Sequence, residues 1–145
     1  MRIVIQRVSK ASVSINGRII GSIGKGVVIL LGISKGDTEK NVDILSLRCI
    51  KLRIFEDENE KLNLSMKDIQ GEALIISQFT LCADTKKGRR PSFTKAASYS
   101  VAKPLYERFV TVFEREGIHT ETGDFGSKML VDIHNDGPVT LILDT

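Results

Sequence analysis

Polar side chains follow a strongly apolar run in the middle of the chain, where they could do chemistry. The segment EALIISQFTLCAD, residues 72–84, begins as a buried strand and then reaches Ser77, Gln78, Phe79 and Thr80. Polar groups at the end of a core strand cost stability unless they are hydrogen-bonded, so they either cap a loop or form a site. If the strand stays extended, alternation points Ser77 and Phe79 to one face and their neighbours to the other.

A basic loop follows this segment directly. TKKGRRPSFTK, residues 85–95, contains no acid and carries the cations Lys86, Lys87, Arg89, Arg90 and Lys95. Cations beside an aromatic ring suit a phosphate-bearing substrate, because Lys and Arg hold phosphates while Phe79 stacks on a base. The alternative is a solvated surface loop, since the net charge of +3 does not by itself indicate nucleic acid.

The run NDGPVTLILDT places a Gly-Pro pair in front of a short apolar strand. Asn135, Asp136 and Gly137 would suffice for a turn. Pro138 removes an amide donor at the entrance to the strand and makes the preceding bond a candidate cis peptide. The pair is therefore either part of an ordinary loop or backbone that a site requires.

Other chemistries find little support. The two histidines, His119 and His134, lack the ligand spacing of a zinc site, so we expect no metal and no cofactor. Walker A, GxGxxG and GxSxG motifs do not occur in the sequence, which argues against nucleotide hydrolysis, dinucleotide chemistry and a nucleophile elbow. A Ser-His-Asp triad stays open, because its members need not be adjacent in sequence.

The composition is typical of a soluble globular protein, with 41% hydrophobic and 27% charged residues. A chain of 145 residues predicts one domain, residues 1–145, with enough buried surface for a core. Cys49 and Cys82 lie in apolar segments, which predicts buried thiols in a reducing compartment. We find no signal peptide and no membrane-length apolar run, so we expect a cytoplasmic protein without a membrane partner.

The elements that must position these residues are mostly strands. We expect strands at residues 2–8, 11–15, 18–23, 27–33, 118–121, 129–134 and 139–143, and another at the start of the segment 72–84. A hairpin turn should lie at Asn16-Gly17, and the apolar run 27–33 should lie at the centre of the sheet. One helix should run from Asp37 or Thr38 to about Ile50, and a second from Ser98 to Gly117; Pro104 either kinks the second or marks a start nearer Lys103. This predicts an α+β fold, a mostly antiparallel, barrel-like sheet with two helices.

Two motifs, SQFTL at residues 77–81 and NDGPVT at residues 135–140, resemble the paired signature motifs of the D-aminoacyl-tRNA deacylases. The resemblance covers the whole chain, including IQRVSKASV, GKGVVILLGI, LRIF and RRPSF. It implies a carboxylic ester hydrolase of translation quality control. The substrate would be the ester between a D-amino acid, or mischarged glycine, and the 3′ adenosine of tRNA.

The resemblance also implies a homodimer with a shared site. A cis Gly137-Pro138 bond would reach from one subunit into the partner's active site and reject L-amino acids, with Arg7 fixing the loop. The implied catalytic residues are Ser77, Gln78, Phe79 and Thr80. The implied substrate contacts are Gly137, Pro138, Phe79, Met129 and Arg7, and the tRNA phosphates would meet Lys86, Lys87, Arg89 and Arg90.

The mechanism is intelligible from general chemistry. An aminoacyl ester is already activated, so a positioned water and preorganised oxyanion donors could suffice. The sequence supplies no obvious base for Thr80 as nucleophile, which favours backbone amides helped by the substrate's 2′-hydroxyl. Blocking the L direction with backbone atoms works for every side chain at once. The alternatives are a non-catalytic tRNA-binding dimer, a related editor with a trans Gly-Pro bond and relaxed chirality, and a purely structural dimer.

Overall fold

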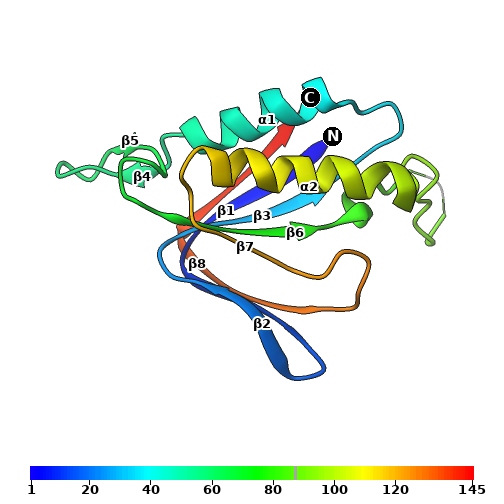
Figure 1. Cartoon of the computed structure of the whole chain (residues 1–145), viewed down its shortest axis with the longest axis horizontal. Helices are drawn as coiled ribbons and strands as arrows, with labels where there is room; N and C mark the ends of the chain where they lie inside the picture. The colour runs from blue at the N-terminus through cyan, green and yellow to red at the C-terminus, as the bar shows by residue number, and fades with distance from the viewer. Residues whose placement is uncertain (87) are drawn as a thin grey trace.

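The computed structural model describes residues 1–86 and 88–145 (Figure 1). Its centre is a six-stranded sheet in which the order β2-β1-β3-β6-β7 is extended by β8, a partner of β1. These strands are β1 (Arg2–Ile15), β2 (Arg18–Ile23), β3 (Gly26–Gly32), β6 (Glu72–Ser77), β7 (Thr120–Thr122) and β8 (Leu130–Asp144). A separate two-stranded pair consists of β4 (Phe55–Glu56) and β5 (Leu62–Leu64).

The sheet is mostly antiparallel, as predicted. β1 runs antiparallel to β2, β3 and β8, whereas β3 with β6 and β6 with β7 pair in parallel. The predicted strands 2–8 and 11–15 are one continuous strand, β1, because β8 pairs with both of its halves while β3 and β2 each pair with one. The prediction of two separate strands there was wrong.

Two helices cover one face of the sheet (Figure 1). α1 (Glu39–Lys51) begins after the N-cap Thr38, and α2 (Tyr99–Arg115) begins after the N-cap Ser98, both as predicted. α2 runs through Pro104, which lies near its N-terminal end, so the later start near Lys103 was wrong. Gly117 follows α2 with a φ of 81°, a left-handed conformation that glycine adopts without steric cost and that commonly ends helices.

The core has two parts because the sheet is covered on both faces. Val27, Ile29 and Leu31 of β3 pack toward the helices, while Val28 packs into a second cluster with Leu74 and Ile76 of β6. This second cluster lies inside the curl of the sheet, which brings β2 onto β6 and β7. The strand at the centre is therefore buried on both sides, and the barrel-like prediction is confirmed.

Local signals account for the remaining details. Asn16 and Gly17 have positive φ values of 50° and 78°, as the tight hairpin turn between β1 and β2 requires. Cys49 and Cys82 are free and buried, as predicted. In the described part of the chain, no helix is long and apolar enough to cross a bilayer.

Candidate active site

The SQFTL segment, residues 77–81, leaves the sheet at the end of β6. β6 stops at Ser77, and residues Phe79–Cys82 form a short 3-10 helix, η1. Gln78 makes the break, with a φ of −142° and a ψ of 76°, while its N–H donates to the carbonyl of Leu31 over 2.8 Å. The predicted alternation was therefore wrong, because Ser77, Gln78 and Phe79 all line one cavity.

The cavity lined by Ser77, Gln78 and Phe79, called the site cavity below, has a volume of about 190 Å³ and apolar walls. Leu31 and Ile33 close it from the end of β3, Ala102 and Tyr99 from α2, and Phe125 from the loop after β7. Cavities that hold whole drug-sized ligands measure roughly 300–1,000 Å³. The site cavity is therefore large enough for one ring or side chain of a substrate, and the rest must lie outside it.

Aromatic rings dominate the far wall of the site cavity. The Tyr99 and Phe125 rings meet edge to face with centroids 5.3 Å apart, and Tyr106 packs on Phe125 at the same separation. The Tyr106 hydroxyl donates to the Ile75 carbonyl over 2.7 Å, and burial raises the pKa of that phenol. A wall of this kind is rigid and suits a flat ring.

The surroundings of Thr80 do not favour a role as a covalent nucleophile. Its side chain is exposed, and its Oγ1 accepts a hydrogen bond from Nε2 of Gln78. A neutral carboxamide cannot take the proton of the hydroxyl, so this contact does not activate Thr80 as a nucleophile.

Phe79 links the site cavity to the basic loop. Its ring is 58% exposed and packs edge to face on Phe93, with centroids 5.1 Å apart. Reciprocal backbone hydrogen bonds of 2.8 and 2.9 Å between Asp84 and Ser92 close the base of the loop. The loop therefore begins and ends beside the SQFTL segment.

Three cations of the loop face solvent. Lys86, Arg89 and Arg90 are exposed, and Lys87 lies outside the described residues. Lys95 pairs with Asp84 over 3.4 Å. Hydrogen bonds from the Lys86 N–H and from Lys95 lower the pKa of the Asp84 carboxyl. Asp84 and Lys95 thus belong to the base of the loop, whereas the exposed cations can meet phosphates.

The Gly-Pro loop, residues 136–139, is a bulge within β8. Val8 of β1 pairs with Asn135 and Gln6 pairs with Thr140, so four residues of β8 stand opposite Arg7 alone. The chain does not reverse here, so the prediction of a turn between two strands was wrong. The Gly137-Pro138 bond is cis, and Gly137 has a φ of 120°.

A buried arginine supports the Gly-Pro loop. Arg7 is only 5% exposed, and its guanidinium donates to the carbonyls of Asp136 and Ile54 over 3.1 and 3.0 Å. It also meets the carboxylates of Glu56 at 3.3 Å and Asp136 at 3.5 Å. An arginine can satisfy several acceptors at once because its donors form a fixed fork.

The side chain of Asn135 closes the base of the same loop, and the sequence reasoning missed it. Its Nδ2 donates to the carbonyls of Arg7 and Val139 over 2.9 and 3.0 Å. Thr140 donates to its Oδ1 over 3.2 Å. Both residues belong to the NDGPVT motif, which was the only available signal.

The structure does not bring the two motifs together within one chain. Ser77 pairs with Leu31 and Leu31 with Ile3, whereas the Gly-Pro loop leaves β8 beside Arg7, four residues further along β1. The loop is therefore displaced from Ser77 by three strand spacings across the sheet and by four residues along the strands. At about 4.8 Å per strand and about 3.3 Å per residue, these displacements place the loop roughly 20 Å from the site cavity. In Figure 1 the end of β6 and the middle of β8 accordingly lie toward opposite ends of the molecule.

Met129 lies apart from the site cavity. It immediately precedes β8, is half-buried, and packs against the cluster inside the curled sheet. Its Sδ occupies the space that a side chain at position 123 would need, so Met129 and Gly123 are in close contact. A substrate contact by Met129 is therefore not evident from its place in a single chain.

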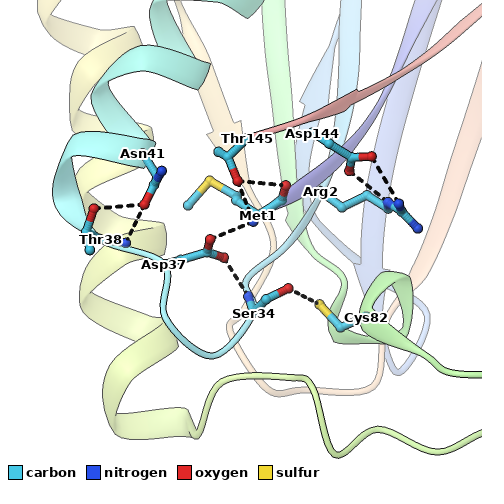
Figure 2. A network of polar contacts seen from close by, with 9 residues as sticks. All are labelled: Met1, Arg2, Ser34, Asp37, Thr38, Asn41, Cys82, Asp144 and Thr145. Atoms are coloured by element: carbon cyan, nitrogen blue, oxygen red, sulfur yellow. Dashed lines mark hydrogen bonds and ion pairs between the residues drawn. The ribbon is translucent and has the colours of Figure 1, made fainter.

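A polar network ties η1 to the loop before α1 (Figure 2). Oγ of Ser34 lies 3.3 Å from Sγ of Cys82, the last residue of η1. The N–H of Ser34 donates to Asp37 over 2.7 Å, and the other oxygen of Asp37 accepts from the Met1 ammonium over 2.6 Å. The end of η1 is thus held from a second direction.

Across residues 1–86 and 88–145, His, Cys, Asp and Glu form no group of three or more that could hold a metal ion. Each histidine has one acidic neighbour two residues away in sequence, Glu121 for His119 at 3.5 Å and Asp132 for His134 at 3.6 Å.

The fold and the site together define a small α+β protein with a curled sheet, two helices on one face and an aromatic-walled cavity at the end of a central strand. A solved structure described as a c-Myc DNA Unwinding Element Binding Protein matches it with a TM-score of 0.94 and 40% identity, over 100% of this chain and 99% of that chain. A structure described as a probable eukaryotic D-amino acid tRNA deacylase shares the fold with a TM-score of 0.82 at 18% identity, over 99% and 98% of the two chains.

Sequence comparison identifies the family. The chain is 53% identical over its whole length to a D-aminoacyl-tRNA deacylase of Fervidobacterium nodosum, covering 97% of that protein. It is 51% identical over its whole length to one from Dehalococcoides mccartyi, covering 95%. The family model described as D-Tyr-tRNA(Tyr) deacylase matches residues 4–144. The chain belongs to the D-Tyr-tRNA(Tyr) deacylase family.

Proposed function

We propose that the acting unit of this enzyme is a homodimer, in which the Gly-Pro loop of one copy completes the site cavity of the other. As a member of its family, the chain is a hydrolase that cleaves the ester between a D-amino acid and tRNA. The loop of the partner would stand on the side where an L side chain would project. Chirality is then read by exclusion, which serves every amino acid alike.

The observation that carries this proposal is the separation of the two motifs within one chain. The site cavity is too small for a whole aminoacyl-adenosine, and the Gly-Pro loop lies roughly 20 Å away on another strand. The loop is exposed, with Gly137 and Pro138 both open to solvent. A second copy related by two-fold symmetry would supply a loop to each cavity, as closed dimers commonly do.

The supports of the loop suit a blocking role. Arg7 holds the Asp136 carbonyl, and Asn135 bridges the two strands at the base of the loop. Gly137 contributes no side chain that could meet the substrate. Backbone held in this way can exclude one enantiomer without a change of shape, because its position is fixed before the substrate arrives.

The site cavity is proposed to hold the terminal adenine of tRNA. The aromatic rings of its wall and the exposed ring of Phe79 offer stacking surfaces. Lys86, Lys87, Arg89 and Arg90 would hold nearby phosphates. Backbone N–H groups of Phe79 and Thr80 would stabilise the oxyanion, and the substrate's 2′-hydroxyl would assist the attack of water. Residues 1–145 would act as one domain, in the cytoplasm where charged tRNA is used.

The test compares the deacylation of D- and L-tyrosyl-tRNA by the wild type and by Gly137→Ala. A Cβ at position 137 would lie 2.7 Å from Nη2 of Arg7 and 2.9 Å from Cγ2 of Val139, at a φ that only glycine adopts readily. The loop must shift, so we expect the D-to-L rate ratio to fall. Gly36→Ala is the matched control, because Gly36 also has a positive φ, of 90°, but nothing lies within 4 Å.

Two results would contradict the proposal. One is an unchanged D-to-L ratio in a folded Gly137→Ala protein. The other is a wild-type enzyme that is monomeric by analytical ultracentrifugation at the concentrations where it discriminates between the two esters.

A further inference from the structure

Gly32 occupies a position where the chain needs space rather than flexibility. It is the last residue of β3, and η1 folds back directly across it. A Cβ at this position would lie 2.9 Å from Cβ of Leu81, 3.0 Å from the Gln78 carbonyl oxygen and 3.3 Å from Sγ of Cys82. Carbon atoms pack at about 3.5–4.0 Å, so a side chain here would collide with the last two residues of η1 and with Gln78, which precedes η1.

The backbone conformation does not explain the glycine. Gly32 is not among the glycines with positive φ in this chain, so any residue could adopt its conformation. The absence of a side chain therefore serves the approach of η1. Two neighbours of Gly32 hold η1 in the same place, since the Leu31 carbonyl accepts from Gln78 N–H and Ser34 contacts Cys82.

We propose that Gly32 is a positioning residue for the deacylation reaction. The bare Cα lets η1 lie directly on the end of β3, and this contact sets where Ser77, Gln78 and Phe79 stand around the site cavity. Gly32 itself touches no substrate in this account. The inference rests on the proposed role of residues 77–80 and adds the support that fixes them.

The mechanism of the effect follows from geometry. A methyl group at position 32 would push Gln78 and Leu81 outward by several tenths of an ångström. Catalytic groups held by backbone lose efficiency steeply with displacement, and a shift of about 1 Å can cost about a hundredfold in rate. The basic loop is closed by its own backbone hydrogen bonds between Asp84 and Ser92, which a methyl group at position 32 does not meet, so binding of tRNA phosphates should change little.

The experiment compares Gly32→Ala with Gly24→Ala. Gly24 also lacks a positive φ, and a Cβ there meets only Oε2 of Glu72 at an ordinary 3.6 Å, so it controls for the loss of a glycine. For D-tyrosyl-tRNA we expect kcat of Gly32→Ala to fall about 10- to 100-fold. The KM should stay within about threefold of the wild-type value, since the tRNA contacts remain. Circular dichroism establishes that each variant is folded at the assay temperature.

A second comparison covers the case in which Gly32→Ala does not fold. Leu81→Gly removes the Cβ that the new methyl group would meet, while the contact with the Gln78 carbonyl remains. The double variant should then show a lower kcat than Leu81→Gly alone. Equal kcat values in this pair, or in Gly32→Ala and Gly24→Ala when both fold, would overturn the inference. A wild type that fails to discriminate D- from L-tyrosyl-tRNA would instead contradict the proposed function and leave the kcat comparison intact.

Discussion

Arg7→Met, compared with Arg2→Met, tests whether the buried arginine holds the Gly-Pro loop. Both residues lie on β1 and both make ion pairs, but their surroundings differ. Arg7 is 5% exposed, whereas the side chains of Arg2 and its partner Asp144 are about half exposed, at 51% and 49%. Methionine keeps much of the apolar stem in each case, so the comparison isolates the guanidinium.

The expected cost can be worked out from the contacts. Removal of the Arg7 guanidinium leaves the buried carbonyl of Ile54 unpaired, which costs about 1–3 kcal/mol, and loses a charged hydrogen bond to Asp136. The carboxylates of Glu56 and Asp136 are half exposed, so water can hydrate them once the guanidinium is removed. Their loss of a charged partner therefore adds little to the cost in stability. We expect Arg7→Met to lose about 2–4 kcal/mol and Arg2→Met to lose under about 1 kcal/mol.

Urea denaturation followed by circular dichroism measures this difference. With an m value of about 2 kcal/mol/M, the midpoint of Arg7→Met should fall by about 1–2 M, while that of Arg2→Met barely moves. The D-to-L rate ratio on tyrosyl-tRNA should also narrow for Arg7→Met alone. Equal midpoints for the two variants, or an unchanged ratio in folded Arg7→Met, would refute the idea that Arg7 fixes the loop.

Further predictions concern the cavity, the basic loop, metals and acid. Ala102→Phe should abolish deacylation while the fold persists, because the new ring occupies the site cavity. Near wild-type activity of this variant would exclude the site cavity as the place where the terminal adenine binds. Neutralising Lys86 and Arg89 should raise KM and reduce the log–log salt slope by about 0.7–0.9 for each lost phosphate contact, whereas an unchanged slope would make the loop an ordinary surface. Activity should survive a strong chelator, and a loss reversed by added metal would contradict this. The Arg108 hydrogen bond lowers the pKa of Asp43, so their pair stabilises the fold above a pH of about 4 and is lost as pH falls through the lowered value. Asp43→Asn should therefore flatten the fall of Tm below that pH, and an identical acid profile would argue against it.

Features that depend on neighbouring residues in sequence were predictable. Asn16-Gly17 produced its hairpin, Thr38 and Ser98 began the two helices, and the apolar run after Gly26 became the central strand. In each case the deciding interaction lies within a few residues, either a cap, a turn conformation or an alternation of buried side chains.

Features that depend on distant partners were not predictable in the same way. The end of β6 at Ser77 is decided by the Leu31 carbonyl and by the space above Gly32, both far away in sequence. The Gly-Pro loop looked like a turn, but pairing of β8 with both halves of β1 keeps the chain running in one direction. Both motifs of the candidate site were recognisable, whereas their separation follows from strand order, which no local pattern encodes.

A mixed dimer tests most directly whether the loop of one copy acts on the cavity of the other. One subunit carries Gly137→Ala, with an intact cavity and a displaced loop, and the second carries Ala102→Phe, with a blocked cavity and an intact loop. The two are co-expressed with different tags, purified as a mixed pair, and assayed on D- and L-tyrosyl-tRNA. The single working cavity then faces the intact loop of its partner, so the D-to-L ratio should equal that of the wild type. A ratio equal to that of Gly137→Ala alone would show that each loop serves its own chain and would contradict the account.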